Sequence, residues 1–189
     1  MASPLRVLSL CTGIGGLDLG VCGTVNARVV ACVERDPYAA SVLLARMEDE
    51  TLESAPIWCG DLRELDPTPF IGEVDILVGG YPCQPFSTAG KRRAEDDPRH
   101  LWPAIRELIR TIRPPLCFFE NVRGHLSLGF DRVLCDLADL GMDARWATVK
   151  ASDVGAPQRR ERLFILAYSE RPDDERRGKP GDVLGKTGE

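Results

Sequence analysis

A cysteine in a loop of glycine and proline is the residue of this chain best suited to covalent chemistry. Cys83 lies within residues 79–87, which read Gly-Gly-Tyr-Pro-Cys-Gln-Pro-Phe-Ser and follow the apolar run 74–78. A thiol at the carboxyl end of a buried strand is displayed where α/β sheets bind ligands. Cysteine is also the most nucleophilic side chain near neutral pH. Most free cysteines are nevertheless small buried hydrophobic residues, so this residue alone does not establish a nucleophile.

A carboxylate and two arginines could complete a site around this thiol. Glu120 follows the apolar segment 116–119, which we expect to form the strand beside the one that leads to Cys83. Apolar surroundings would favour the protonated carboxyl group and suit it to donate a proton, whereas strand ends also often carry carboxylates turned to solvent. Arg160 and Arg162 precede the last expected strand and could hold a phosphate or a carbonyl oxygen, or cap a solvated edge.

A glycine-rich turn and two acidic residues could bind a nucleoside. Gly13, Gly15 and Gly16 lie between an expected strand and an expected helix, where the backbone can approach a ligand closely. Glu34 follows at the spacing typical of a carboxylate that binds ribose hydroxyls. The turn lacks the full Gly-x-Gly-x-x-Gly pattern and a lysine for phosphates, which indicates a cofactor without a diphosphate. Asp61 could accept a hydrogen bond from an adenine amino group or cap a turn.

Strand-like and helix-like segments alternate along the chain. We expect strands at 6–11, 28–33, around 57, 74–78, 116–119, 144–149 and 163–168, with helices from 17, at 37–47, 101–112 and 130–140. This alternation predicts an α/β fold with a mostly parallel sheet and helices on both faces. Residues 170–189 are rich in charge and almost without apolar side chains. We therefore expect a catalytic domain over 1–169 and a disordered charged tail over 170–189.

Composition restricts the classes of protein to consider. The 189 residues are 43% hydrophobic, enough for one core. The seven cysteines are odd in number and form no Cys-x-x-Cys pair, which argues against a disulfide framework or a zinc site. His100 and His125 are isolated and are interpreted as surface or satisfied loop residues rather than metal ligands. With no apolar run of membrane-spanning length and no leader, we expect a cytoplasmic protein. The net charge of −5 lacks the basic surplus usual in a free-standing nucleic-acid binder.

Taken together, these motifs closely resemble the DNA (cytosine-5) methyltransferase family. Six of them follow the family's order: Gly-x-Gly-Gly at 13–16, Glu34, Gly60-Asp61, Pro82-Cys83-Gln84, Glu120-Asn121-Val122 and Gln158-x-Arg160-x-Arg162. The resemblance implies a Rossmann-like methyltransferase fold, C-terminally truncated here. It also implies transfer of a methyl group from S-adenosyl-L-methionine to carbon 5 of cytosine in double-stranded DNA, with the base flipped out of the helix.

The resemblance also assigns roles to individual residues. The catalytic set would be Cys83, which bonds to the base, with Glu120, Arg160 and Arg162. The cofactor would contact Cys11, Gly13, Gly15, Gly16, Glu34, Asp61, Pro82 and Leu101. The substrate would contact Gln84, Ser87, Asn121 and Val122. Cys11 stands where the family often carries phenylalanine, so its smaller contact area predicts weaker cofactor binding.

Complete members of this family continue with a target recognition region and a terminal segment that these 189 residues lack. Three interpretations follow. The chain could be the catalytic part of a DNA methyltransferase, as in restriction-modification systems, with a separate recognition subunit. It could be a truncated, inactive remnant, or a non-catalytic S-adenosylmethionine-binding module. The presence of both Cys83 and Glu120 argues against the third interpretation; an RNA substrate is a lesser variant of the first.

Overall fold

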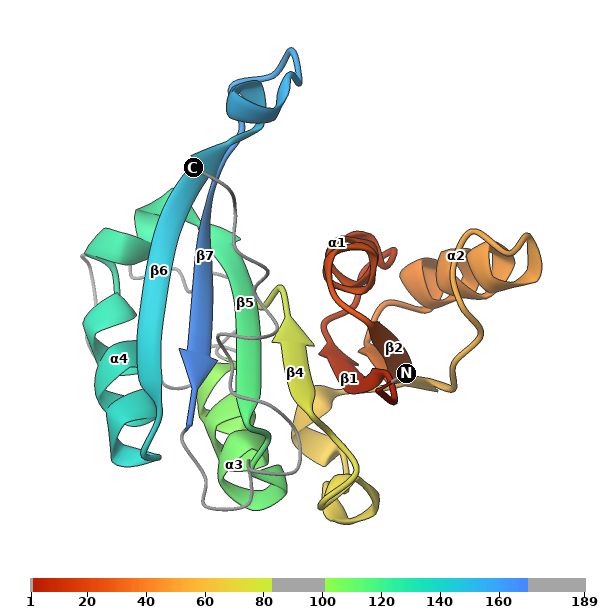
Figure 1. Ribbon diagram of the computed structural model, residues 1–189, viewed down its shortest axis with the longest axis horizontal. Coiled ribbons are helices and arrows are strands. Elements are labelled where there is room, and N and C mark those ends of the chain that lie inside the picture. Colours follow the sequence, from red (N-terminus) through yellow and green to blue (C-terminus); the bar gives the residue numbers. More distant parts are fainter. Residues whose placement is uncertain (1, 83–100, 170–189) are drawn as a thin grey trace.

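The computed structural model describes residues 2–82 and 101–169, and these residues build one seven-stranded sheet (Figure 1). Its strands are β1 (Leu5–Leu10), β2 (Ala27–Glu34), β3 (Ile57–Cys59), β4 (Ile76–Gly79), β5 (Leu116–Val122), β6 (Asp143–Lys150) and β7 (Glu161–Tyr168). They are ordered β3-β2-β1-β4-β5-β7-β6 across the sheet. Only β7 runs antiparallel to its neighbours. The predicted mostly parallel α/β sheet is confirmed, and β4 and β5 are neighbours as expected.

Helices cover both faces of the sheet. They are α1 (Gly16–Thr24), α2 (Pro37–Glu48), α3 (Trp102–Ile112) and α4 (Phe130–Asp139). Helix α2 begins as its sequence predicts, because the Asp36 carboxylate accepts a 2.9 Å hydrogen bond from the Tyr38 amide and Pro37 occupies the first turn. Helices α1 and α2 lie at the β1–β2 end of the sheet, and α3 and α4 lie behind its β5–β6 end (Figure 1).

The buried core is divided unequally between the two faces. Helix α3 buries its apolar stripe against the sheet, as the spacing of Ile105, Leu108, Ile109 and Ile112 predicts. The larger core cluster joins this stripe to α4 and to the inner residues of the strands. The cluster under α1 is much smaller, with only four fully buried members: Val7, Ile76, Val78 and Leu116.

Two strands extend further than their apolar segments predict. Strand β5 continues to Val122, and β7 begins at Glu161. Pairing of Asn121 with Leu163 and of Val122 with Arg162 keeps polar residues in the sheet. Ladder hydrogen bonds form between backbone groups, so they do not depend on apolar side chains. The expected tail over 170–189 lies outside the described residues. Among the residues described, none of the helices is long and apolar enough to cross a membrane.

Candidate active site

The sequence motifs meet at one edge of the sheet. Strands β1 to β5 are parallel and therefore all end at this edge, while antiparallel β7 begins there. The glycine turn follows β1, Glu34 ends β2, Asp61 follows β3, the Cys83 loop follows β4, and Glu120 lies near the end of β5. Ligands of open α/β sheets bind at this edge, beside the point where the strand order reverses. That reversal lies here between β1 and β4.

A cavity of about 480 Å³ opens at this edge, beyond β1, β2 and β3. Five residues predicted to contact the cofactor line it: Cys11, Glu34, Asp61, Pro82 and Leu101. The remaining lining residues are Val33, Arg35, Asp36, Pro37, Gly60 and Leu62. Three carboxylates, those of Glu34, Asp36 and Asp61, and several apolar surfaces thus face one hollow. This lining suits a ligand with hydroxyl and amino groups and apolar parts, and the carboxylates would repel a diphosphate.

The glycines shape the turn rather than line the cavity. Gly13 and Gly15 have φ angles of 59° and 80°, a left-handed conformation that favours glycine. The Gly13 amide donates a 2.6 Å hydrogen bond to Glu34 Oε2, and the Asp36 amide donates one of 2.8 Å to Oε1. Glu34 therefore fastens the turn to the start of α2. Each of its oxygens has a further lone pair that a ribose hydroxyl can use.

Asp61 caps a turn, as one of the two interpretations of its sequence position predicts, and it also faces the cavity. Its Oδ1 accepts a 3.1 Å hydrogen bond from the Arg63 amide and so caps a short 3₁₀ helix, Leu62–Glu64. The same carboxylate lines the cavity. The hydrogen bond from the Arg63 side chain is the main cause that lowers its pKa to about 2, with a smaller contribution from Arg35. Asp61 is therefore an ionised acceptor at neutral pH.

Cys11 contributes packing surface rather than a nucleophile. Burial raises the pKa of its thiol to about 12, assisted by the nearby carboxylates of Glu34 and Asp61. The residue has a φ of 50°, an uncommon conformation for a side chain other than glycine. Such positions occur where a backbone is held against a ligand site. Its protonated sulfur faces the cavity as a small apolar group.

Glu120 is held by arginine rather than by apolar surroundings. Arg162 Nε lies 2.6 Å from Glu120 Oε1, and Arg160 Nη2 lies 3.7 Å from the same oxygen. Arg162 pairs with Val122, so it lies diagonally across the ladder from Glu120 on the same face. Its side chain is 25% exposed, whereas that of Arg160 is 57% exposed, so Arg162 makes the stronger contact. The apolar environment predicted for Glu120 is therefore wrong, and both predicted arginines lie at the carboxylate.

The chain that leads to Cys83 runs between Glu120 and the cavity. Cys83, Gln84 and Ser87 lie outside the described residues. A Cβ atom placed on Gly80 would lie 3.5 Å from Glu120 Oε2, and Pro82 lines the cavity. The described part of the loop thus links the carboxylate to the cavity.

The hydrogen bonds that position this loop were not predicted from sequence. Buried Asn121 donates a 3.1 Å hydrogen bond to the Tyr81 carbonyl, and its own Oδ1 accepts from the Val122 amide. The geometry favours a positioning role for Asn121 over the predicted substrate contact, whereas Val122 is 39% exposed at the strand end. The Tyr81 hydroxyl lies 3.1 Å from Nε2 of His125.

His125 anchors the far end of this network. Its Nδ1 lies 2.9 Å from the Leu128 carbonyl, so Nδ1 carries the proton and Nε2 accepts from the Tyr81 hydroxyl. Burial lowers the pKa of His125, which keeps the ring neutral. His100 lies outside the described residues, and the expectation of a satisfied loop histidine is confirmed for His125. The only sequence signal for the role of its partner Tyr81 is that an aromatic residue stands two positions before Cys83.

Comparisons with known proteins identify related chains. A family model described as C-5 cytosine-specific DNA methylase matches residues 5–181. Type II methyltransferase M.NaeI of Lentzea aerocolonigenes is 37% identical over 86% of this chain, and the match covers 40% of M.NaeI. Type II methyltransferase M.AquIA of Picosynechococcus is 32% identical over 96% of this chain and 73% of its own length.

The fold is shared with a solved structure of a mutant of DNMT2 from Spodoptera frugiperda. The TM-score is 0.73 at 22% identity, over 89% of this chain and 51% of that chain. The chain thus spans about half of this structural neighbour and 40% of M.NaeI. The Rossmann-like methyltransferase fold predicted from the motifs is confirmed.

Proposed function

The chain belongs to the family of C-5 cytosine-specific DNA methylases, and from this premise we propose that it carries the catalytic part of a DNA methyltransferase. The family uses S-adenosyl-L-methionine as methyl donor. The reaction proposed here is transfer of a methyl group to carbon 5 of cytosine in double-stranded DNA. The curated relatives are type II methyltransferases, which supports a role in restriction-modification in the cytoplasm of a bacterial or phage-infected cell.

One observation carries the proposal. Glu120 pairs with Arg162 and lies against the backbone of Gly80, three residues before Cys83. Pro82, which lies between Gly80 and Cys83 in the sequence, lines the same cavity as Glu34 and Asp61. A carboxyl group, a thiol-bearing loop and a nucleoside-sized hollow therefore share one end of the sheet. A cytosine base and a methyl donor could approach each other there.

The chemistry requires a nucleophile and an acid because cytosine carbon 5 is too weakly nucleophilic to accept a methyl group directly. We propose that the Cys83 thiolate adds to carbon 6 while Glu120 supplies a proton to ring nitrogen 3. Bound S-adenosyl-L-methionine would supply an electrophilic methyl group to carbon 5 and leave as S-adenosylhomocysteine. Loss of the carbon 5 proton to a base and return of the nitrogen 3 proton to Glu120 then expel the Cys83 thiolate and restore the aromatic ring. Arg162 orients the carboxyl group, and exposed Arg160 is free to approach the base or a phosphate.

The cofactor fits the residues that line the cavity. Glu34 would accept hydrogen bonds from the ribose hydroxyls, and Asp61 would accept one from the adenine amino group. Cys11 and Leu101 would cover the apolar faces of the adenosine. Target choice would come from a recognition region outside these 189 residues. The match to M.AquIA supports a separate recognition subunit. This chain covers 73% of M.AquIA but only 40% of M.NaeI, so M.AquIA has much less sequence beyond the shared part.

A covalent trap tests the role of Cys83. DNA that contains 5-fluorocytosine cannot lose its substituent from carbon 5, so an adduct accumulates even when recognition is weak. With S-adenosyl-L-methionine present, we expect the chain to form a stable adduct with this DNA and the Cys83→Ser variant to form none. Cys135→Ser, which changes an exposed cysteine on α4, is the matched control and should retain the adduct.

The outcome separates the competing functions. An adduct that persists in Cys83→Ser would reject the assignment of the nucleophile. Binding of S-adenosyl-L-methionine, measured by calorimetry, without any adduct would favour the non-catalytic binding module. Absence of both would favour an inactive remnant. Replacing the DNA by 5-fluorocytosine-containing RNA distinguishes the two polymers.

A further inference from the structure

One side of the cofactor cavity comes from two residues that lie outside the first three strands. Pro82, after β4, and Leu101, directly before α3, line the cavity, whereas the other lining residues lie at the ends of β1, β2 and β3 and in the segments that follow them. Leu101 stands at the N-cap position of α3, and its side chain has no polar atom with which to cap the helix. The residues adjacent to Pro82 and Leu101 supply contacts that fix this side of the cavity.

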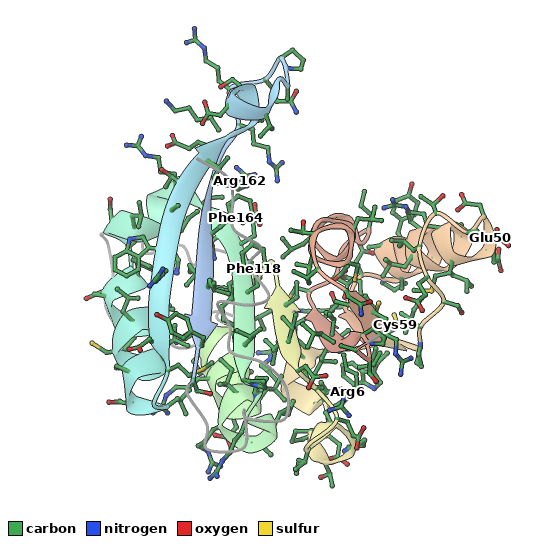
Figure 2. All side chains as sticks on the ribbon, in the orientation of Figure 1. Arg6, Glu50, Cys59, Phe118, Arg162 and Phe164 are labelled. Carbon is green, nitrogen blue, oxygen red and sulfur yellow. The ribbon has the colours of Figure 1, made fainter. Side chains whose placement is uncertain are left out.

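Two buried aromatic residues, Tyr81 and Trp102, are the sequence neighbours of these two lining residues, and they pack against each other. Their ring centroids lie 5.5 Å apart, and each lies 5.8 Å from the ring of Phe119 on β5. Figure 2 shows Phe118 and Phe164 on the face of the sheet turned to the viewer. Since side chains alternate along a strand, Phe119 points to the opposite face, where it joins the core under α3 and α4. The three rings of Tyr81, Trp102 and Phe119 form one buried cluster, here called the aromatic anchor.

Two rings of the aromatic anchor are also tied by hydrogen bonds to buried polar side chains. The Tyr81 hydroxyl donates to Nε2 of His125 at 3.1 Å, and Trp102 Nε1 donates to Asp136 Oδ2 on α4 at 2.8 Å. Asp136 is 4% exposed, and its Oδ1 accepts a 3.1 Å hydrogen bond from Arg132 Nε, so its carboxylate is itself held in place. A buried indole N–H is costly to leave unpaired, so this bond favours one orientation of the Trp102 ring.

We infer that Asp136 is a positioning residue for the cofactor cavity. Through its hydrogen bond it fixes the Trp102 ring, and the ring in turn fixes Leu101 against the bound adenosine. His125 holds the other polar ring of the aromatic anchor in the same way. Asp136 is not among the residues that line the cavity, so it acts through Trp102 rather than by contact with the ligand. This inference rests on the proposed function, because it takes S-adenosyl-L-methionine as the ligand of the cavity.

Binding of S-adenosylhomocysteine, measured by calorimetry, tests the role of Asp136. Asp136→Leu keeps the approximate shape of the side chain but removes the acceptor, and we expect it to weaken binding by about tenfold, as for loss of one buried hydrogen bond. Asp136→Asn keeps an acceptor oxygen for the indole N–H and should restore binding to within about threefold of the unchanged chain. Arg132→Met is the matched control. It removes an ion pair with the same carboxylate at a side chain that is 75% exposed, and it should leave binding unchanged.

A double-mutant cycle tests whether Asp136 acts through Trp102. Trp102→Phe removes the indole donor but keeps an aromatic ring, and it should weaken binding about as much as Asp136→Leu does. If the carboxylate acts through the indole, the variant with both changes should bind no more weakly than Trp102→Phe alone. Full additivity of the two changes would overturn the inference, as would an Asp136→Leu variant that binds as tightly as the unchanged chain.

Hydrogen exchange tests the aromatic anchor without any ligand. The Ile105 amide donates a 3.0 Å hydrogen bond to the Leu101 carbonyl at the start of α3, and the Arg113 amide donates one of 2.8 Å to the Ile109 carbonyl at its end. In Asp136→Leu we expect the Ile105 amide to exchange about tenfold faster and the Arg113 amide to exchange at its former rate. Equal acceleration at both ends would indicate a general loss of stability and would reject a positioning role.

The two measurements separate failure of this inference from failure of the proposed function. If the unchanged chain binds no S-adenosylhomocysteine, the assignment of the cofactor fails, and exchange of the Ile105 amide still decides whether Asp136 holds Leu101 in place. If the unchanged chain binds S-adenosylhomocysteine and Asp136→Leu alters neither binding nor exchange, the inference fails and the assignment of the cofactor remains.

Discussion

At the scale of residues, the candidate active site depends on one ion pair. The carboxyl group of Glu120 can serve a cytosine base only if it points towards Gly80 and the loop that follows β4, and the 2.6 Å contact with Arg162 Nε holds it there. Hydrogen bonds between charged groups are stronger than neutral ones and contribute about 1.5–3 kcal/mol. Arg162 is therefore a positioning residue for Glu120, and the more exposed Arg160 is a secondary one.

We expect Arg162→Ala to slow formation of the 5-fluorocytosine adduct by about 10- to 100-fold, because losing the ion pair frees the carboxyl group to rotate. Arg160→Ala should slow it by less than about fivefold, as is usual for an exposed partner. Circular dichroism and the midpoint of urea unfolding check that the fold persists. Equal slowing of adduct formation by Arg162→Ala and Arg160→Ala would contradict the assignment of Arg162 as the stronger partner of Glu120.

The second prediction at this scale concerns Cys11. Its pKa of about 12 keeps the thiol protonated at neutral pH, because burial and two carboxylates oppose the thiolate. With iodoacetamide near pH 8, we expect exposed Cys59 and Cys135 to be alkylated and Cys11 to remain unmodified, as read by peptide mass spectrometry.

The raised pKa of Cys11 also has a consequence for stability. The folded-state value lies above the ordinary value of 9.0, so the thiol favours folding fully below about pH 9 and this contribution is lost as the pH rises towards 12. Rapid alkylation of Cys11 in the folded chain at neutral pH would contradict the burial on which both expectations rest.

At the scale of elements, the connection between β1 and α1 is the most constrained segment of the site. Gly15 precedes α1 with a φ of 80°, and a Cβ there would lie 2.7 Å from Leu52 Cδ1. Gly16, the next residue, has open space and begins the helix. The two adjacent glycines therefore differ in what a side chain would meet. At Gly15 it would meet a left-handed backbone and the close neighbour Leu52, whereas at Gly16 it would meet open space.

We expect Gly15→Ala to lower the free energy of unfolding by about 1–2 kcal/mol, because a side chain in the left-handed region is strained and would also crowd Leu52. Gly16→Ala should leave that free energy unchanged or raise it slightly, since alanine is the better helix former. Urea denaturation of both variants provides the measurement. A loss of stability in Gly16→Ala as large as in Gly15→Ala would argue against this distinction.

At the scale of the whole molecule, the chain spans only part of the relatives that it matches, 40% in the case of M.NaeI. Its net charge of −5 gives it little general attraction to DNA phosphates.

We expect the 189-residue chain by itself to transfer labelled methyl groups to DNA slowly and without preference for one sequence. The reason is physical: with a net charge of −5, the chain has no general basic surplus to hold the DNA phosphates. Transfer of tritiated methyl from S-adenosyl-L-methionine to a panel of duplexes measures it. Efficient methylation of a single sequence by this chain alone would contradict the expectation.

The sequence by itself determined the segments and the motifs that they carry. Periodicity and turn residues are local signals, so the strands, the α2 cap and the glycine turn could be predicted from neighbouring residues. Because parallel strands end at a common edge, the order of motifs also brought Glu34, Asp61, Glu120 and the Cys83 loop together.

Only the tertiary structure decided how these pieces meet across the sheet. Insertion of β7 antiparallel between β5 and β6 brings Arg162 to Glu120 and gives that carboxylate charged rather than apolar surroundings. The bonds between Tyr81, Asn121 and His125 likewise depend on contacts between residues far apart in the chain. Side-chain pattern does not encode such pairings, because backbone ladders accept any residue and the cost of closing a loop depends only weakly on its length.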